Sequence, residues 1–298
     1  MEHTTEVVTR LVFQLAVILI AAKIGGEAVE RFFKMPSVLG ELAAGIVIGP
    51  FALGGLDLPG VGPLFVGAFD TAENTGFVIP VSESLWSLSQ VGAVVLLFVA
   101  GLETNMRQFL RYAGPATAVA LGGVVLPFAL GVVLTVNFGY ASGYSDPKAL
   151  IVGAVLMATS IGITARVLAD LGSLNTPEGV TVMGAAVIDD VIGILALTIV
   201  VGISLTGEFS SATVGWVALK SVGFWIILTG GGFLVFPYIA KVFEKFQVPG
   251  SVLALSLSLA LLAAGLAEVV GLAMIIGSFS VGLAMSGTQL AERLEIAL

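Results

Sequence analysis

The sequence contains no cysteine and a single histidine, His3, among its 298 residues. Without thiols, a disulfide framework, a thiolate nucleophile and an iron–sulfur cluster are all excluded. Because His3 lies in the polar N-terminal tail, we expect no imidazole in the interior of the protein. Any proton that the interior handles must therefore be carried by carboxyl, hydroxyl or lysine groups.

Charge is scarce as well. Asp, Glu, Lys and Arg make up 11% of the chain, whereas soluble domains carry about 25%. Hydrophobic residues make up 57%, and the mean hydropathy is +1.09. One soluble core could not hide so much apolar surface, so the composition excludes a soluble enzyme, a disordered chain and a fibrous repeat, and indicates an integral membrane protein. The net charge of −8 argues against a nucleic-acid partner and against polybasic attachment to anionic lipid.

Apolar runs separated by glycine, proline and charge predict nine membrane-spanning helices. The runs lack the apolar/polar alternation over roughly ten residues that barrel strands show, which favours an all-α, polytopic helix bundle. A tight turn around residues 269–271 separates the last two runs. The predicted spans are 7–26, 37–53, 85–102, 113–137, 149–168, 180–205, 214–238, 251–268 and 271–286.

The orientation in the membrane follows from the loop charges, because Lys and Arg are retained on the cytoplasmic side. With the N-terminus outside, nine of these residues lie on the inner side and three on the outer side. We therefore expect a multi-pass plasma (inner) membrane protein with an outside N-terminus and a cytoplasmic C-terminus. The inner residues are Lys23, Arg31, Lys34, Arg107, Arg111, Arg166, Lys241, Lys245 and Arg293; the outer ones are Arg10, Lys148 and Lys220; the acids of the outer loop 54–84 are Asp57, Asp70, Glu73 and Glu83.

Two adjacent acids, Asp189 and Asp190, stand near the middle of the predicted span 180–205. An ionised carboxylate at the bilayer centre costs about 2.5–3.5 kcal/mol even on a lenient scale, so such a pair indicates function. Neighbouring helix residues point about 100° apart, so one acid can face a watery cavity while the other pairs with a base. Oxygen ligands suit hard cations such as Na⁺. The pair predicts exchange of a proton for a cation, and the alternative is two acids that only pin helices together.

Hydroxyl groups cluster in the preceding span. Thr159, Ser160 and Thr164 surround Gly162. Hydroxyls and glycine can support a helix that is broken inside a membrane, and the freed carbonyls can then coordinate an ion. The alternative is ordinary hydrogen bonding of each hydroxyl to the carbonyl four residues earlier. The acid pair one helix later favours the broken helix.

A glycine-rich helix recurs in opposite predicted orientations, over residues 40–50 and 271–282. Such a recurrence is what a transporter built from inverted repeats requires. Within the first copy we expect Glu41 to be an interfacial residue or a tertiary hydrogen-bond partner rather than an ion ligand. The spacing of Gly45 and Gly49 predicts close helix packing at these two residues.

Five stretches together resemble the monovalent cation:proton antiporters of the sodium/hydrogen exchanger family, specifically the bacterial NapA/GerN-type branch. The similarity extends from about residue 10 to residue 290, with the stretches in the order that the family shows. They are Pro36-Ser-Val-Leu-Gly-Glu and its continuation to Pro50, Gly92 to Thr104, Ala158-Thr-Ser-Ile-Gly-Ile-Thr-Ala-Arg-Val-Leu, Ala186-Val-Ile-Asp-Asp-Val, and Glu268 to Leu283.

The resemblance implies a thirteen-helix fold in which two six-helix inverted repeats are joined by a linker helix. One membrane transporter domain would fill residues 1–298, with 7–205 as the first repeat, 206–245 as the linker helix and 246–298 as the start of the second repeat. The family continues for about four more helices, so we expect this sequence to be a C-terminally truncated antiporter. The resemblance also implies a homodimer, in which a core domain moves against a dimerisation domain.

By the same resemblance, Asp190 carries the proton and binds the cation, and is thus the expected Na⁺ ligand. Asp189 is its neighbour, salt-bridged to a base in a later helix, while Thr159 and Ser160 lie at the unwound part of a broken crossing helix. The expected function is exchange of Na⁺, or of K⁺ or Li⁺, for protons by alternating access, with proton and cation competing for Asp190. No cofactor is implied beyond the transported ions, and the protein is expected not to be an enzyme.

Three other functions are weighed against this one. A same-fold symporter of an organic anion would favour a base or a helix N-terminus in the cavity, where the sequence supplies acids. An intramembrane aspartyl protease needs one Asp from each of two facing helices, whereas Asp189 and Asp190 share one helix. A structural or receptor-like membrane protein would show no dependence of its stability on cations.

Overall fold

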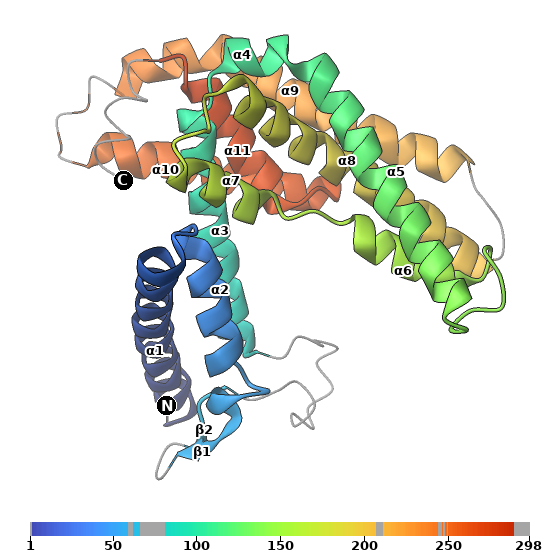
Figure 1. The fold of residues 1–298 in the computed structure, drawn as a ribbon. Helices are drawn as coiled ribbons and strands as arrows, with labels where there is room; N and C mark the ends of the chain where they lie inside the picture. Colours follow the sequence, from blue (N-terminus) through green and yellow to red (C-terminus); the bar gives the residue numbers. More distant parts are fainter. Residues whose placement is uncertain are drawn as a thin grey trace. The chain divides into compact units, whose positions relative to one another are not determined.

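The computed structural model describes residues 2–58, 62–65, 81–206, 211–243, 246, 248 and 250–288. Asp70, Glu73, Lys245 and Arg293, which entered the predicted charge pattern, lie outside the described residues. The chain divides into two compact units, Met1–Gly92 and Ala93–Leu298, and each is described by itself (Figure 1).

Helices form nearly all of the described secondary structure. Two two-residue strands, β1 (Asp57–Leu58) and β2 (Gly62–Pro63), pair antiparallel beside a short 3₁₀ helix, η1 (Leu53–Gly55). The helices are α1 (Glu2–Phe33), α2 (Ser37–Ile48), α3 (Glu83–Glu103), α4 (Met106–Arg111), α5 (Ala113–Asn137), α6 (Pro147–Met157), α7 (Ile161–Asp170), α8 (Pro177–Thr206), α9 (Ser211–Phe243), α10 (Ser251–Val270) and α11 (Met274–Met285).

Within the described residues, eight segments are long and apolar enough to cross a membrane, and they coincide with the first eight predicted spans. One of the eight, Pro147–Asp170, is made of two helices, α6 and α7. The ninth predicted span corresponds to α11, which has 12 residues, fewer than the roughly 20 that span a bilayer. The prediction of an all-α, polytopic bundle is confirmed.

The first unit is built on a helical hairpin of α1 and α2, which touch at two glycines. A Cβ atom on Gly40 would collide with the carbonyl oxygen of Gly25, so the two backbones are in direct contact there. The ammonium of Lys23 donates to Oε1 of Glu41 at 3.1 Å, which confirms Glu41 as a tertiary hydrogen-bond partner.

Gly45 differs from Gly40, because a Cβ on Gly45 would meet no atom within 4 Å among the described residues. Among the described residues, Gly25 and Gly40 make the close helix contact, and the packing role of Gly45 stays a prediction.

The segment after α2 is held against the N-terminal half of α1 by hydrogen bonds. The buried amide of Gln14 donates to the carbonyl oxygen of Leu64 at 2.8 Å, and the guanidinium of Arg10 donates to that of Pro63. Around these bonds, Leu64 and Phe65 are buried in an apolar cluster that includes residues of α1. Two polar side chains of α1 thus satisfy backbone carbonyls that have no helical partner.

The second unit has α11 at its core, since every residue from Ile276 to Met285 is buried. Helix α3 contacts α11 at Gly101 and Gly282, where each added Cβ would meet backbone atoms of the other helix. The largest apolar cluster of this unit joins residues of α3, α4, α7, α8 and α11, namely Leu97, Ala100, Met106, Phe109, Ile161, Ala165, Leu174, Val180, Met183, Ala186, Val187, Phe279 and Leu283. This core supports α8, which carries the acid pair, and α7, which begins directly after Thr159 and Ser160.

A second hairpin, α10–α11, repeats the local geometry of α1–α2. Each has a three-residue connection that starts with a left-handed residue, Lys34 (φ 55°) or Gly271 (φ 88°). Each connection ends with nearly the same backbone angles (Pro36 at −53°, 136° and Ala273 at −59°, 136°), and each second helix has 12 residues. The fourth residue of that helix is a glycine in both, and Gly277 approaches the carbonyl of Ala263 as Gly40 approaches that of Gly25.

We predict that Gly40→Val lowers the free energy of unfolding by about 1–3 kcal/mol, because the new side chain forces the two backbones of the α1–α2 hairpin apart. Gly45→Val is the matched control, since it makes the same change of residue in the same helix where there is room for it. Denaturation of the purified variants in detergent measures both. Equal stability of the two variants would contradict the close contact.

A carboxylate begins α6. The side chain of Asp146 accepts hydrogen bonds from the backbone N–H (2.9 Å) and hydroxyl (2.7 Å) of Ser142 and from the backbone N–H of Lys148 (3.0 Å). These donors, with the N–H of Ser142 contributing most, lower the pKa of Asp146 from 3.8 to about 2. Asp146 thus closes the loop between α5 and α6 and satisfies the first turn of α6.

The lowered pKa predicts a pH-dependent contribution to stability. The ionised form of Asp146 stabilises the folded state fully above pH 3.8, and this contribution is lost as the pH falls towards 2. The difference in unfolding free energy between the wild type and Asp146→Asn should therefore shrink to nothing over that range. In a Ser142→Ala background, which lacks one donor, the difference in unfolding free energy made by Asp146→Asn should already be smaller above pH 3.8. A difference that does not change with pH would show that the carboxylate is not stabilised in the folded state.

Candidate functional site

The candidate site begins where the fifth predicted span is interrupted. Helix α6 ends at Met157 and α7 begins at Ile161. Between them Ala158 (φ −65°, ψ 119°) and Ser160 (φ −87°, ψ 104°) are extended. The interruption includes Thr159 and Ser160, where the sequence predicts unwinding. Backbone groups released from a helix inside a membrane need other partners, because no water is available in the hydrocarbon region.

Hydroxyl groups satisfy part of this interruption. Oγ of Ser160 accepts a hydrogen bond from the backbone N–H of Ile163 at 3.4 Å and so caps α7. The hydroxyl of Thr164 donates to the carbonyl oxygen of Ser160 at 2.9 Å. For Thr164, the ordinary hydrogen bond to the carbonyl four residues earlier is therefore the correct interpretation.

Thr159 connects the interruption to the acid pair. Both its hydroxyl and its backbone N–H lie beside the carboxyl group of Asp189 in α8. The hydroxyl also lies 3.4 Å from the carbonyl oxygen of Met157, at the long end of hydrogen-bond distances. Asp189 is 6% exposed. A buried carboxyl thus lies beside a backbone donor that the helix break has released.

Asp189 and Asp190 differ in their surroundings. Asp190 is partly exposed, whereas Asp189 is buried. Oδ1 of Asp189 and Oδ2 of Asp190 are buried and have no hydrogen-bond partner among the described residues. In that part of the chain the ion pairs are Lys23–Glu41 and Arg166–Asp170, and neither includes the acid pair. Two acceptor oxygens are therefore left for a proton, a cation or water.

A metal ion at Asp190 would need ligands other than charged side chains. The described residues contain no group of three or more His, Cys, Asp or Glu that could hold a metal. Na⁺ is a hard cation that accepts hydroxyl, carbonyl and water oxygens. The break at residues 158–160 supplies oxygens of these kinds next to Asp189.

A second connection between helices lies beside the same part of α8. Val191, the residue after Asp190, packs against the buried cluster of Ala267, Leu272 and Ile276, where α10 gives way to α11. Gly271 ends α10 there. Its backbone N–H donates to the carbonyl oxygen of Glu268, and the N–H of Leu272 donates to that of Ala267. This left-handed ending suits glycine, which has no Cβ to clash. The sequence predicts a turn at residues 269–271, and the connection covers residues 271–273.

Trp225 of α9 is a neighbour that sequence reasoning did not single out. Its ring packs with Val191 against the cluster where α10 meets α11 and lies 6.4 Å from the ring of Phe109. The indole Nε1 is buried without an acceptor among the described residues. One tryptophan in an apolar helix carries no sequence signal for a place beside the acid pair, because such residues are common in membrane proteins.

Comparison with known proteins identifies relatives along nearly the whole chain. Residues 15–298 match the family model described as sodium/hydrogen exchanger, transmembrane. The chain is 36% identical over 97% of its length to the high-affinity Na⁺/H⁺ antiporter NhaS3 of Synechocystis, covering 64% of that relative. It is 34% identical over 95% of its length to the Na⁺/H⁺-K⁺ antiporter GerN of Bacillus cereus, covering 65% of it. It is 33% identical over 95% of its length to the probable Na⁺/H⁺ antiporter GerT of the same organism, covering 67%.

These relatives are named as transporters and not as enzymes. The chain spans about two thirds of the length of the relatives that it matches. The Thr-Ser and Asp-Asp pairs both lie within the stretch that matches the family model.

We predict that the hydroxyl of Thr159 and the carboxyl of Asp189 are energetically coupled. Thr159→Val should lower the unfolding free energy by about 1 kcal/mol, since a buried acceptor loses one donor, whereas Thr159→Ser should not. Combining Thr159→Val with Asp189→Asn should give a coupling energy of about 0.5 kcal/mol or more. Thr164→Val is the control, and its combination with Asp189→Asn should be additive. Additivity for Thr159 as well would mean that the two groups do not interact.

Proposed function

This chain belongs to the sodium/hydrogen exchanger family, and we propose on that premise that it exchanges Na⁺ for protons across a membrane by alternating access. K⁺ and Li⁺ are further candidate cations. Asp190 is the group for which proton and cation compete, and Asp189, Thr159 and Ser160 complete the site. The named activity of the relatives supports cation:proton exchange as the class of transport.

The observation that carries this proposal is the link from Thr159 to Asp189. It joins a helix that is broken inside an apolar span to an acid pair on the next spanning helix. Transporters that bind ions at the membrane midplane use such a combination of interrupted helix and ionisable side chain. The chain supplies two acids and the oxygens of the break at this place, and their negative charge favours a cationic substrate over an organic anion.

Charge balance gives the competition a physical cause. An ionised carboxylate in the membrane is unstable without a positive partner, and either a proton or a cation can supply it. Asp190 is the more exposed of the two acids, so it is the one that can exchange its partner with an aqueous cavity. Asp189, buried and held by Thr159, keeps the broken helix in place while this exchange happens.

The wider organisation is part of the same proposal. The matching geometry of the α1–α2 and α10–α11 hairpins supports equivalent starts of two repeats, with 7–205 as the first, 206–245 as the linker helix and 246–298 as the start of the second. Orientation with the N-terminus outside the inner membrane rests on the loop charges. The homodimer rests on the family resemblance.

Everted membrane vesicles that contain the protein test the exchange directly. Adding Na⁺ to acidified vesicles should release protons, and Asp190→Asn should reduce this release to the background of vesicles without the protein. A falling pH should raise the Na⁺ concentration needed for half-maximal exchange, because protons occupy the same carboxylate. Glu178→Gln is the matched control, an exposed acid in the first turn of the same helix.

The possible results distinguish an error in the assigned site residue from an error in the proposed function. Normal exchange by Asp190→Asn would refute the assignment of Asp190 but leave the transport class intact. The proposed function would be refuted by two results together. Wild-type vesicles would show no Na⁺-dependent proton release, and the purified protein would show no Na⁺-dependent rise in thermal stability. A bound ion stabilises a protein by RT ln(1 + [ion]/Kd), so this second measurement does not depend on transport.

A further inference from the structure

An apolar groove runs along the first hairpin, between α1 and α2. Its cavity volume is about 520 Å³. The lining consists of aliphatic and small residues, and the glycine contact between the two helices lies at its base. The lining residues are Val17, Ile20, Ala21, Ile24, Gly25, Ala28, Val29, Gly40, Ala43, Ala44, Val47 and Ile48. The groove is apolar along its whole length, as a hydrocarbon chain would require.

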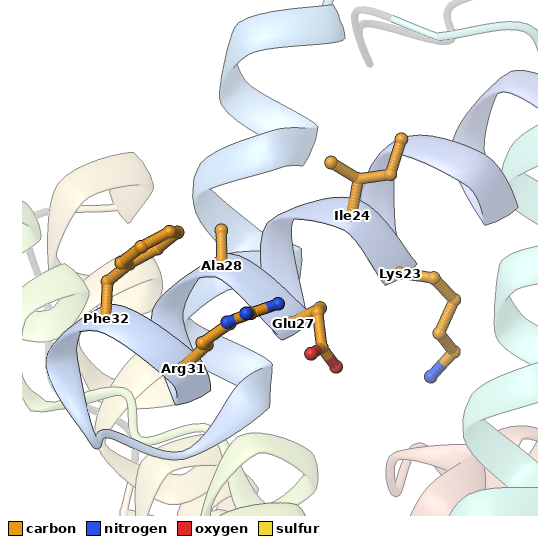
Figure 2. Close-up of a pocket in the computed structure, with 6 residues that line it drawn as sticks. All are labelled: Lys23, Ile24, Glu27, Ala28, Arg31 and Phe32. Carbon is orange, nitrogen blue, oxygen red and sulfur yellow. The ribbon is translucent and has the colours of Figure 1, made fainter.

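A second cavity, of about 410 Å³, continues this groove towards the C-terminal end of α1. Ile24 and Ala28 line both cavities, so the two adjoin each other along α1. The second cavity adds Lys23, Glu27 and Arg31 to its apolar residues (Figure 2). The apolar groove therefore opens into a charged end.

The charged end offers one cation and one anion. The ammonium of Lys23 is already paired with Glu41 at 3.1 Å. Arg31 and Glu27 are exposed, and within the described part of the chain neither has an ion pair or a side-chain hydrogen bond. They are one helical turn apart, and their side chains extend to the same side of α1 (Figure 2). An occupant that satisfies both must carry a negative and a positive group close together.

The length of the site matches one leaflet. Val17 and Arg31 are separated by 14 residues, or about 21 Å along a helix. Half of the hydrocarbon core is about 15 Å thick, and the headgroup region of one leaflet adds about 6 Å. The candidate span Val7–Phe33 has 27 residues, more than the roughly 20 needed to cross the hydrocarbon core. The last turns of α1 are thus in the headgroup region when the apolar part is in the membrane.

We propose that this groove binds one phospholipid with a zwitterionic, primary-amine headgroup, such as phosphatidylethanolamine. The guanidinium of Arg31 binds the phosphate, the carboxylate of Glu27 accepts hydrogen bonds from the ammonium, and an acyl chain fills the apolar groove. A purely anionic lipid leaves its headgroup next to an unpaired Glu27. A choline headgroup has no N–H to donate. An apolar helix of a second copy would cover the groove but leave both charges without partners.

Native mass spectrometry of the purified protein, titrated with phosphatidylethanolamine, phosphatidylcholine or phosphatidylglycerol of the same acyl chains, tests the proposal. The wild type should retain one phosphatidylethanolamine with the highest affinity of the three. Arg31→Gln should weaken its binding roughly tenfold, as expected for the loss of a charged hydrogen bond. Glu27→Gln should abolish the preference for ethanolamine over choline while phosphatidylcholine still binds. Ala28→Phe, which fills the groove, should weaken all three lipids.

Two variants serve as controls. Glu30→Gln and Arg107→Gln remove an exposed acid and an exposed base that do not line the groove, and should bind lipid as the wild type does. Unchanged melting temperatures in lipid-free detergent show that the groove variants are folded. Tighter binding of phosphatidylglycerol than of phosphatidylethanolamine, or unchanged selectivity in Glu27→Gln, would overturn the proposal. The proposal would also be overturned if the wild type bound no lipid and Ala28→Phe weakened the association of two copies instead.

Discussion

The structure depends on one constraint of the membrane interior, where every backbone donor and acceptor needs a partner within the protein. The chain breaks a spanning helix at residues 158–160 and must then satisfy the groups that the break releases. Ser160 caps the second half, and the carboxyl of Asp189 lies beside the backbone N–H of Thr159. The two costly features of the sequence, a broken helix and a buried acid, therefore reduce each other's cost. Removing either one would leave the other with an unsatisfied polar group.

Small residues provide the rigid frame that this arrangement needs. Lipid tails are as apolar as leucine, so membrane helices associate through close packing rather than through exclusion of water. Gly25 with Gly40, and Gly101 with Gly282, bring pairs of backbones into direct contact. In the second unit this places the fully buried α11 against α3, in the same apolar cluster that includes residues of α7 and α8. The broken helix and the acid pair thus stand on a closely packed base, and side chains at the interruption can be placed reproducibly.

The sequence alone predicts those features that depend on composition and on neighbours along the chain. Apolar runs locate eight of the spans, and the Thr-Ser pair beside Gly162 locates the interruption. Features that depend on how helices rotate about their axes cannot be read in this way. Gly40 and Gly45 belong to the same glycine-rich stretch, but five residues turn a helix by about 140° beyond a full circle, so only tertiary structure decides which one faces α1. The left-handed Lys34 is equally hidden, because lysine rarely adopts that conformation.

Under the proposed function, the differing environments of Asp189 and Asp190 explain why two acids are used where one could bind an ion. A carboxylate that stabilises a helix break has to stay where it is, and Asp189 is buried beside Thr159. A carboxylate that exchanges its partner has to meet water, and Asp190 is the more exposed. One residue cannot meet both demands, since exchange would repeatedly remove the charge on which the break depends. Placing the two on adjacent positions points them about 100° apart, which separates the structural role from the exchanging one. Under the proposed function, the charge at Asp190 can then change while the frame around Thr159 holds its shape.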